Sequence, residues 1–403
     1  MKNILVIGTL DTKGEEFSYL KAQIERLGMR ATVMDLGILG APAFAGDIPR
    51  EAVMTRAGVS LARLRDGNAR GAAIEAAILG GQRIAIELFE KGEIDGVIAM
   101  GGGSGTSMGT KIMRLLPLGF PKCLVTTLSN LTQFLGNSDI CVLRSMVDLV
   151  GLNSLTRTII QEAAAAITGM TENRPDAQAL KSCVAVSCLG VTTPCVMKLR
   201  EGLLKRGRDV VVLHFYTGIA DDLAREGRLE AMLDITPCEL TKGLIYPETG
   251  GMPRRLEAVR EAGVPIITAP GALDMLLNAT PLEKVPQALA GRQYIAHSPN
   301  MTLLQTTAQE RARMGAYIAG DLCRAKGPAV IVIPEGGFSM WDAPGKAFYD
   351  PDGIRAFTQS AEAEAGGRLR LRRSPGNIND DRFAQDVLRV FDEIMDEKME
   401  GNV

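Results

Sequence analysis

The sequence predicts an α/β protein of two Rossmann-like lobes, each built on a mainly parallel, doubly wound sheet. Three observations carry this prediction. Apolar strand-like runs alternate with helical periodicity along the 403 residues, glycine- or threonine-rich turns follow several of these runs, and one such arrangement occurs twice. A chain of this length fits two domains of ordinary size, each with its own core. We place the two lobes at residues 1–178 and 179–403.

The first lobe opens with a strand, a turn and a helix. Residues 3–8 form an apolar run, and residues 15–27 carry apolar side chains at helical spacing. Gly28 predicts the end of this helix, and residues 31–36 return as a second strand. The remaining predicted elements are a loop at 41–50, a helix at 67–91, strands at 94–100 and 122–126, and a helix at about 153–168.

The second lobe repeats this opening. Residues 183–189 predict a strand, GVTTP at 190–194 a turn, 195–206 a helix and 209–215 a strand. Further strand-like runs lie at 243–246, 264–268 and 329–334, and a helix at about 380–398 closes the chain. In doubly wound sheets ligands bind beyond the carboxyl ends of the strands, where the strand order reverses. We therefore expect the functional residues directly after strands, facing a cleft between the lobes.

Composition excludes several classes of function. A net charge of -2 gives no long-range field for polyanions, so we expect neither nucleic acid nor a membrane as partner. No apolar stretch approaches the roughly 18 residues of a spanning helix, and no signal peptide is visible. Seven cysteines without paired CxxC spacing predict free thiols in a reducing, cytoplasmic setting. Two histidines are too few for a His-rich zinc site, so we predict no such metal centre, whereas magnesium beside a phosphate remains open.

The loop GTLDTKG at 8–14 follows the first strand and suits a phosphate. It supplies a glycine for the turn, two hydroxyls and a compact cation in front of a helix N-terminus. The candidate ligand-site residues are Gly8, Thr9, Asp11, Thr12 and Lys13. Helix capping by Asp11 and Thr12, with Glu15 in the reciprocal position, is the alternative. Capping explains neither Gly8 nor Lys13.

The loop GGGSGT at 101–106 is the strongest single signal. Its backbone amides can approach an anion without interference from side chains, and the candidates are Gly101, Gly102, Gly103, Ser104, Gly105 and Thr106. A flexible turn before a helix is the alternative, but such a turn needs fewer glycines. The loop does not match GxxxxGK[ST], and GxGxxG is absent after the first strand. A nucleotide bound here would use neither standard fingerprint.

Other candidates stand at strand ends or helix starts. Asp35 could accept hydrogen bonds from a ribose or be a solvated strand end. Ser138 and Asp139 follow the fourth strand, and Thr192 and Thr193 open the first helix of the second lobe, where Thr192 could also be only a cap. His214 ends a strand, in the place of an acid or base, or is an ordinary core or surface histidine. Lys13 and His214 are the candidate catalytic residues, and spacing alone assembles no nucleophile, base and orienting group.

With these residues identified, the sequence resembles the Tm-1-like ATP-binding domain family, an uncharacterised family related to a plant virus-resistance protein. The matching stretches are GTLDTKGEE, RGAAIEAA, IDGVIAMGGGSGT, NSDI, VDLVGLN, GVTTPC, PGALDM, YIAHSPNMTL, DAPG with FYDPD, and NIND. The resemblance implies two Rossmann-like subdomains, ATP binding and self-association. Residue by residue, it supports the candidates at 9–13, at 101–106 and at 138–139. Where relatives carry HATGTGG, this chain reads HFYTGIA from His214, so the substrate cannot be transferred from the family.

The leading hypothesis is therefore an ATP- or nucleotide-binding protein of small-molecule metabolism. As an enzyme it would act on a carboxylate or phosphorylated metabolite in the cleft between the lobes, with ATP and magnesium as cofactors, and it would self-associate as a homo-oligomer. A non-catalytic, nucleotide-dependent protein-binding or regulatory module is the alternative. An NAD-dependent oxidoreductase is a weaker one, because GxGxxG is missing. The sequence does not decide whether the protein is an enzyme.

Overall fold

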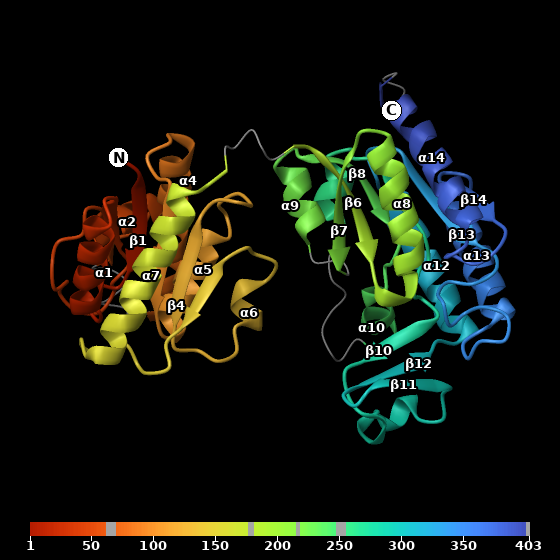
Figure 1. Ribbon diagram of the computed structural model, residues 1–403, viewed down its shortest axis with the longest axis horizontal. Coiled ribbons are helices and arrows are strands. Elements are labelled where there is room, and N and C mark those ends of the chain that lie inside the picture. Colours follow the sequence, from red (N-terminus) through yellow and green to blue (C-terminus); the bar gives the residue numbers. More distant parts are fainter. Residues whose placement is uncertain (62–69, 176–180, 215–217, 247–254, 400–403) are drawn as a thin grey trace. The chain divides into compact units, whose positions relative to one another are not determined.

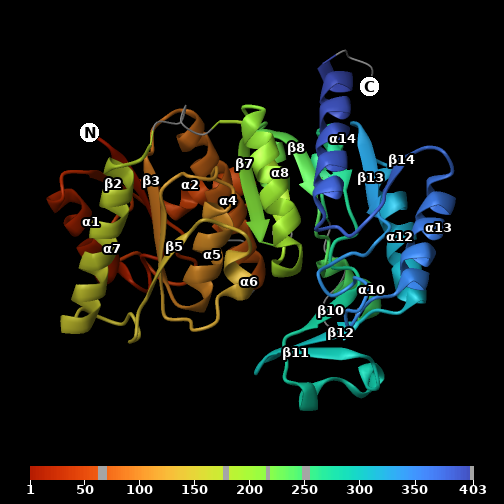
Figure 2. The same ribbon diagram turned by 45° about the vertical axis from the view of Figure 1, so that its right-hand side comes forward.

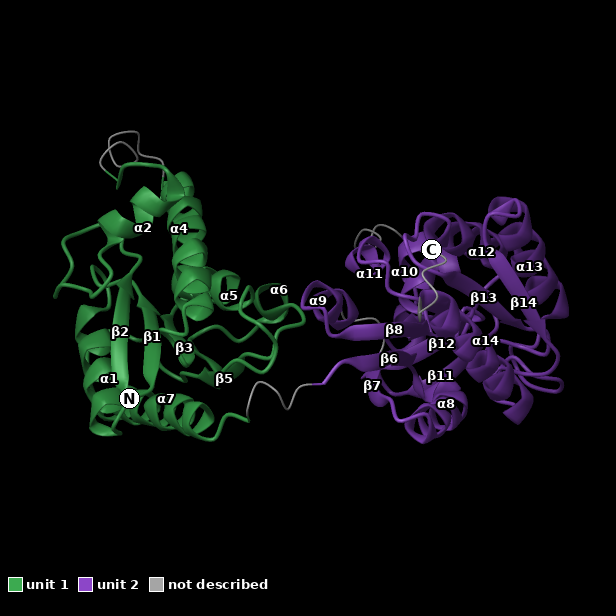
Figure 3. Cartoon of the chain, turned by 90° about the horizontal axis from the view of Figure 1, so that it is seen from above, with its two compact units in different colours: residues 1–179 green, residues 180–403 purple. Residues whose placement is uncertain are grey.

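The computed structural model describes residues 1–61, 70–175, 181–214, 218–246 and 255–399. The chain divides into two compact units, residues 1–179 and 180–403, which we call lobe 1 and lobe 2 and describe separately (Figure 3). The predicted boundary at 178/179 lies outside the described residues. The predicted cleft between the lobes stays a prediction.

Lobe 1 contains a five-stranded parallel sheet in the order β2-β1-β3-β4-β5 (Figure 1). The strands are β1 (Asn3–Gly8), β2 (Arg30–Asp35), β3 (Gly96–Gly101), β4 (Lys122–Thr126) and β5 (Cys141–Arg144). Gly8 pairs in register with Asp35, and Gly101 pairs with Thr126, so the strands end together at one edge. This edge carries the loops that follow each strand.

Helices cover both faces of this sheet (Figure 3). One face packs against α1 (Gly14–Arg26) and α7 (Ser154–Glu172), and the other against α2 (Arg50–Ala57), α4 (Arg70–Glu90) and α5 (Gly103–Met113), while α6 (Thr132–Leu135) is a single turn. Strand β1 shows how the sequence builds these layers. Ile4 and Val6 join the core under α1 and α7, whereas Leu5 and Ile7 join the core under α4 and α5, as alternation along a strand requires.

Lobe 2 contains a six-stranded parallel sheet in the order β14-β13-β9-β8-β6-β7. Its strands are β6 (Cys183–Cys188), β7 (Asp209–His214), β8 (Leu229–Asp234), β9 (Ile266–Thr268), β13 (Ala329–Pro334) and β14 (Arg370–Ser374). Helices α8 (Thr193–Lys205) and α14 (Asp381–Met399) pack on one face, and α12 (Ala308–Leu322) and α13 (Pro351–Ala365) lie on the other (Figure 3). Three shorter helices are α9 (Ile219–Arg225), α10 (Glu239–Ile245) and α11 (Glu257–Glu261).

A separate antiparallel sheet also belongs to lobe 2 (Figure 2). It consists of β10 (Met275–Asn278), β11 (Tyr294–Ser298) and β12 (Met301–Gln305) in the order β10-β12-β11. The sequence analysis missed this sheet, because its strands are short and lie among turn-forming residues.

The two parallel, helix-covered sheets confirm the predicted fold class. Several details of the prediction were wrong or missing, and strands β8 and β14 of lobe 2 were not predicted. Residues 243–246, predicted as a strand, fall largely in helix α10, since a short apolar run does not distinguish a strand from a helix. Strand β5 was missed because its residues are half exposed, and α2 was missed beyond the predicted loop at 41–50. Residues 67–69 of the predicted helix at 67–91 lie outside the described part of the chain.

None of the helices that the structure describes is long and apolar enough to cross a membrane. The longest, α4, has 21 residues and still carries Glu75, Arg83 and Glu87.

Candidate functional site

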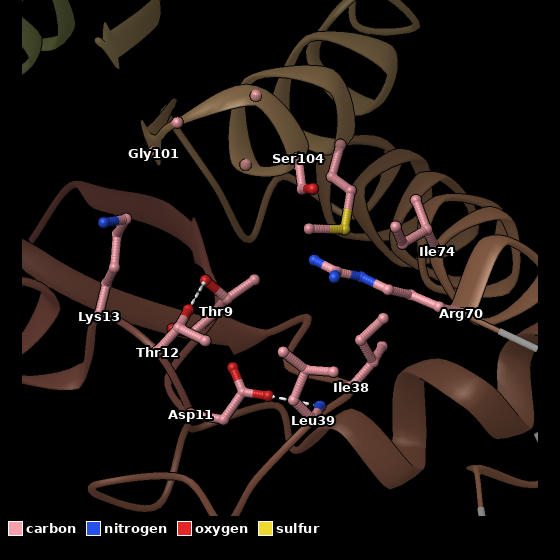
Figure 4. Close-up of a pocket in the computed structure, with 14 residues that line it drawn as sticks. Thr9, Asp11, Thr12, Lys13, Ile38, Leu39, Arg70, Ile74, Gly101 and Ser104 are labelled. Carbon is pink, nitrogen blue, oxygen red and sulfur yellow. Dashed lines mark hydrogen bonds between the residues drawn. The ribbon is translucent and has the colours of Figure 1, made fainter. Parts of the chain in front are cut away.

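The candidate site lies where the strand order of lobe 1 reverses. From β1 the chain continues to β2 on one side, and β3 then pairs on the other side of β1. The loops after β1 and β3 therefore border a common crevice at the carboxyl edge of the sheet. A pocket of about 220 Å³ lies there (Figure 4), and its walls are Thr9, Asp11, Thr12, Lys13, Ile38, Leu39, Arg70, Ile74, Gly101, Gly102, Gly103, Ser104, Gly105 and Met108. Two loops predicted separately from sequence thus meet at one pocket.

The loop after β1 presents polar side chains on a rigid turn. The carbonyl of Thr9 accepts hydrogen bonds from the amides of Thr12 and Lys13, and the hydroxyls of Thr9 and Thr12 lie 2.8 Å apart. Gly8 does not line the pocket. A Cβ atom on Gly8 would lie 2.1 Å from the ring of Phe17, so this glycine serves the packing of α1 on β1 and not a ligand.

Asp11 links this loop to the loop after β2. Its Oδ2 accepts hydrogen bonds from the amides of Leu39 at 2.7 Å and of Gly40 at 3.2 Å. Its Oδ1 is buried and has no hydrogen-bond partner among the described residues. A buried carboxylate oxygen without a partner is costly, so this atom marks a place where a ligand or a cation is expected.

The glycines of the loop after β3 have two different roles. Helix α5 starts at Gly103, and none of the glycines at 101–105 has a positive φ, so close approach and not backbone conformation explains them. A Cβ on Gly101 would lie 2.9 Å from the Cα of Gly105, which places the first turn of α5 directly against the end of β3. A Cβ on Gly103 would meet no atom within 4 Å. Packing therefore does not require a glycine at position 103. An anion that approaches the free amides at the start of the helix does require one, because a side chain there would stand in its way.

Lys13 and Arg70 supply the positive charge of the pocket. The ammonium group of Lys13 donates a hydrogen bond to the carbonyl of Leu149, so it is already engaged. Arg70 begins α4 and points into the space between Thr9 and Ser104 (Figure 4). The described residues offer its guanidinium neither a carboxylate nor a carbonyl partner. The sequence analysis did not assign Arg70 to the site, although RGAAIEAA was among the stretches that resembled the family.

The opposite wall of the pocket is apolar. Ile38 and Leu39 come from the loop after β2, Ile74 from α4 and Met108 from α5. Ile38 and Met108 are buried, whereas Leu39 is 55% exposed. The pocket thus joins a surface rich in hydrogen-bond donors and cations to a flat apolar surface, a combination that suits a ligand with an anionic end and a planar apolar end.

Four other predicted residues of lobe 1 have structural roles, which corrects their assignment to the site. Asp35 is 2% exposed, and its Oδ1 accepts hydrogen bonds from the amides of Leu10 and Gly37. Burial raises the pKa of this carboxyl, and these two hydrogen bonds oppose the rise. These hydrogen bonds give Asp35 a role in holding the turns after β1 and β2.

The remaining three residues of this group also have partners within the protein. The hydroxyl of Thr106 is buried 2.7 Å from that of Thr126. Ser138 donates to the carbonyl of Leu135, and Asp139 forms an ion pair with the buried Lys122 at 2.6 Å. Strand-end position alone therefore did not distinguish ligand-facing residues from those that join loops.

Lobe 2 has a switch point of the same kind, between β6 and β8, but protein groups fill it. The hydroxyls of Thr192 and Thr236 lie 2.7 Å apart and are both buried. Ser187 donates to Oδ1 of Asp234 at 2.9 Å, and Arg255 makes a bidentate ion pair with the same carboxylate at 2.9 Å for each bond. The predicted ligand role of Thr192 is thereby corrected to a structural one.

The start of α8 is satisfied in the same way. Pro194 has no N–H, and the amide of Cys195 donates to Oδ1 of Asn379. The hydroxyl of Thr193 donates to the carbonyl of Leu189, so this predicted residue closes its own turn. The sequence echo between GTLDTKG and GVTTP reflects a shared strand, turn and helix, and the two turns differ in the groups left for a ligand.

His214 ends β7, and its backbone pairs in register with that of Cys188. Its side chain is exposed. Its neighbours at 215–217 lie outside the described residues. The two candidate catalytic residues thus belong to different lobes. Within the described residues, no group of three His, Cys, Asp or Glu side chains could hold a metal ion.

A buried carboxylate pair in lobe 2 was not predicted from the sequence. Asp274 and Asp342 are both fully buried; Ser339 donates to Asp274 at 2.7 Å, and Arg311 donates to Asp342 at 3.0 Å. Oδ1 of Asp274 has no hydrogen-bond partner among the described residues. Burial, and then the charge of Asp342, raise the pKa of Asp274 to about 7. PGALDM and DAPG contain these carboxylates, but nothing in the sequence shows that the two motifs meet.

The N-terminal domain of the uncharacterised protein family UPF0261 matches residues 2–176, and the C-terminal domain of the same family matches residues 181–395. A UPF0261 protein of Rhizobium meliloti is 38% identical over 98% of this chain and 99% of its own length. The ToMV resistance protein Tm-1(GCR237) of Solanum lycopersicum is 32% identical over 77% of this chain and 43% of its own length. These relatives confirm the resemblance drawn from the motifs.

Among solved structures, the S. aureus MnaA-UDP co-structure is similar with a TM-score of 0.21 and 11% identity, covering 100% of this chain and 98% of that one. The UDP-N-acetylglucosamine 2-epimerase of Rickettsia bellii has a TM-score of 0.24 and 9% identity, covering 98% and 97%. Likeness at this level carries no argument about function.

Proposed function

This chain belongs to the uncharacterised protein family UPF0261, and from that premise we propose that it binds a nucleotide, ATP in the first instance, in the pocket of lobe 1. The nucleotide would serve a reaction of small-molecule metabolism on a carboxylate or phosphorylated compound. A cytoplasmic location and self-association belong to the same proposal. The chemistry beyond binding stays open.

One observation carries the proposal. The loops after β1 and β3 open onto one pocket, and Gly103 there leaves empty the space that a side chain would fill in front of the first amides of α5. Amides at a helix N-terminus favour an anion through their hydrogen bonds and through the helix dipole. Arg70 and the hydroxyls of Thr9 and Ser104 lie around the same space. A phosphate chain is the ligand group that this set of donors suits best.

The rest of the pocket suits the remainder of a nucleotide. The apolar side chains of Ile38, Leu39 and Ile74 offer a surface for a base, which is planar and largely apolar on its faces. Asp11 lies between this surface and the donors and has an oxygen without a partner. Magnesium needs only one or two carboxylates when phosphates complete its shell, so Asp11 would hold it beside the phosphates.

Titration calorimetry with ATP, ADP, AMP, adenosine and NAD⁺, each with and without magnesium, tests the proposal. We expect the adenine nucleotides with more phosphates to bind more tightly and adenosine to bind weakly. The melting temperature should rise with the same ligands, because a ligand that binds only the folded state stabilises it. Failure of every nucleotide to bind at millimolar concentration would overturn the proposal.

A second candidate is a non-catalytic module whose binding to another protein depends on the nucleotide. The homologue Tm-1(GCR237) favours it, because its name records resistance to a virus and not an enzyme activity. Separate replacement of Lys13 and His214 distinguishes the candidates. Loss of turnover with retained nucleotide binding supports the enzyme, whereas a change only in affinity for a co-purifying protein supports the module.

A further inference from the structure

The segment at 145–152, which joins β5 to α7, is tied to the start of α1 by two hydrogen bonds. Lys13 donates from its ammonium group to the carbonyl of Leu149, and Oε1 of Glu16 accepts from the amide of Gly151 at 2.6 Å. Lys13 belongs to the loop that lines the pocket, and Glu16 lies in the first turn of α1 that follows it. One of these two hydrogen bonds, the one from Lys13, therefore comes from a residue that lines the pocket.

The two ends of the segment are also held: the amide of Ser145 donates to the carbonyl of Thr126 at 2.8 Å, and the hydroxyl of Thr156 donates to the carbonyl of Gly151 at 3.1 Å. The middle of the segment has fewer ties. The Leu149 side chain is fully buried in the core under α1 and α7, but Met146 is 80% exposed and Val150 is 72% exposed. Asp148 accepts a hydrogen bond from the neighbouring amide of Leu149, which ties the segment only to itself. Exposed backbone with few ties opens locally at a low free-energy cost.

Lys13 cannot serve both partners equally well. A hydrogen bond from an ammonium group to a phosphate joins two opposite charges, whereas one to a carbonyl joins a charge to a dipole, so the phosphate is the stronger partner. A phosphate that enters the pocket would therefore compete with the carbonyl of Leu149 for the ammonium group. The two hydrogen bonds of Lys13 are therefore coupled. Because coupling between two sites is reciprocal, a stronger bond from Lys13 to the carbonyl of Leu149 also weakens the binding of the phosphate.

We infer that Lys13 couples the pocket to the segment at 145–152: a bound phosphate takes over its ammonium group, and the segment is released from α1 at Leu149. This inference rests on the proposed function, since it requires an anionic ligand in the pocket. It makes Lys13 a positioning residue whose partner changes with the ligand. Glu16 is 3% exposed, and within the described residues its hydrogen bond is the other side-chain tie between α1 and this segment.

Hydrogen exchange by mass spectrometry on the full chain tests the inference, with calorimetry on the same samples to establish saturation by ATP. We expect the amides at 145–152 to exchange about five-fold faster or more when ATP is bound, the effect of losing one charge-assisted hydrogen bond. Peptides covering the loop at 189–193 of lobe 2 serve as the internal control and should not change. In Lys13→Met the segment should exchange fast without ATP, and ATP should not accelerate it further.

Each outcome decides the matter. Unchanged or slower exchange of the segment in a sample saturated with ATP overturns the coupling and leaves the nucleotide proposal intact. Absence of ATP binding in the calorimeter overturns both. If Lys13→Met does not fold, the comparison of the natural chain with and without ATP still decides, because it does not depend on the variant.

Discussion

The two lobes have the same switch point in their sheets and use it differently. In lobe 1 the loops after β1 and β3 leave a pocket with the first amides of α5, an arginine and a carboxylate oxygen of Asp11 that has no partner among the described residues. In lobe 2 the loops after β6 and β8 meet through Thr192 and Thr236, and the Asp234–Arg255 ion pair fills the space beneath them. The topology creates a crevice in both lobes, but the side chains at the strand ends decide whether a ligand can enter it.

The largest expected effect is on the stability of lobe 2, when the ion pair at its switch point is removed. Asp234→Ala would leave Arg255 buried without its bidentate partner, and we expect a loss of about 3–5 kcal/mol in the free energy of unfolding. Urea unfolding of lobe 2 measures it. The control is Asp392→Ala, which removes an exposed bidentate pair with Arg206 and should cost under about 1 kcal/mol. Equal losses in the two variants would mean that the filling of lobe 2 is not structural.

The buried carboxylate pair of lobe 2 predicts a pH dependence. The pKa of Asp274 is raised from 3.8 to about 7 in the folded chain, so the folded state holds its proton more tightly than the unfolded state. The stability linked to this group is therefore fully present below pH 3.8 and falls as the pH rises through 7. We expect a loss on the order of 3 kcal/mol between these limits.

Denaturant unfolding of Asp274→Asn across the same pH range checks this prediction. The amide is neutral throughout, so the fall in stability attributable to this position should disappear. Asp396→Asn, exposed on α14 and without contact to the carboxylate pair among the described residues, provides the comparison. An unchanged pH profile in Asp274→Asn would contradict the assignment.

A change in Arg70 tests the open switch point of lobe 1. Replacement by Met removes one charge-assisted contact to the phosphates, and we expect ATP affinity to fall by about 10–100-fold. Arg83→Met is the matched control, because Arg83 lies exposed on the same helix outside the pocket. Calorimetry measures both variants. Equal ATP affinity in the two variants would remove Arg70 from the site.

The smallest expected change concerns Gly103. Gly103→Asp places a carboxylate next to the first amides of α5, and we expect about ten-fold weaker ATP binding through repulsion and lost hydrogen bonds. The fold should not suffer, because an acidic residue in the first turn favours a helix. Gly190→Asp is the same change at the switch point of lobe 2, in the loop after β6, where a Cβ also meets no atom within 4 Å, and it should leave ATP binding unchanged. If both variants weaken ATP binding equally, the conclusion that only the switch point of lobe 1 binds the nucleotide is wrong.

Much of this molecule follows from its sequence. The periodicity at 3–36 and the repeated strand, turn and helix predicted both sheets, and the loops at 8–14 and 101–106 meet at one pocket as strand-end positions suggest. The assignments of Asp35 and Thr192 were wrong for one physical reason. A polar side chain at a strand end can bind a ligand or satisfy a neighbouring turn, and only the path of the adjacent loop decides which. Arg70 was missed because its distance from both loops in sequence hides its place in the pocket.

The contact between Gly101 and Gly105 has a kinetic consequence. Because the first turn of α5 sits directly on the end of β3, the donor amides are already in place before any ligand arrives. An anion can therefore bind without waiting for this part of the chain to rearrange, and its association should be limited by encounter and orientation alone. Differences in affinity between ligands of this pocket should then appear mainly in how long each one stays.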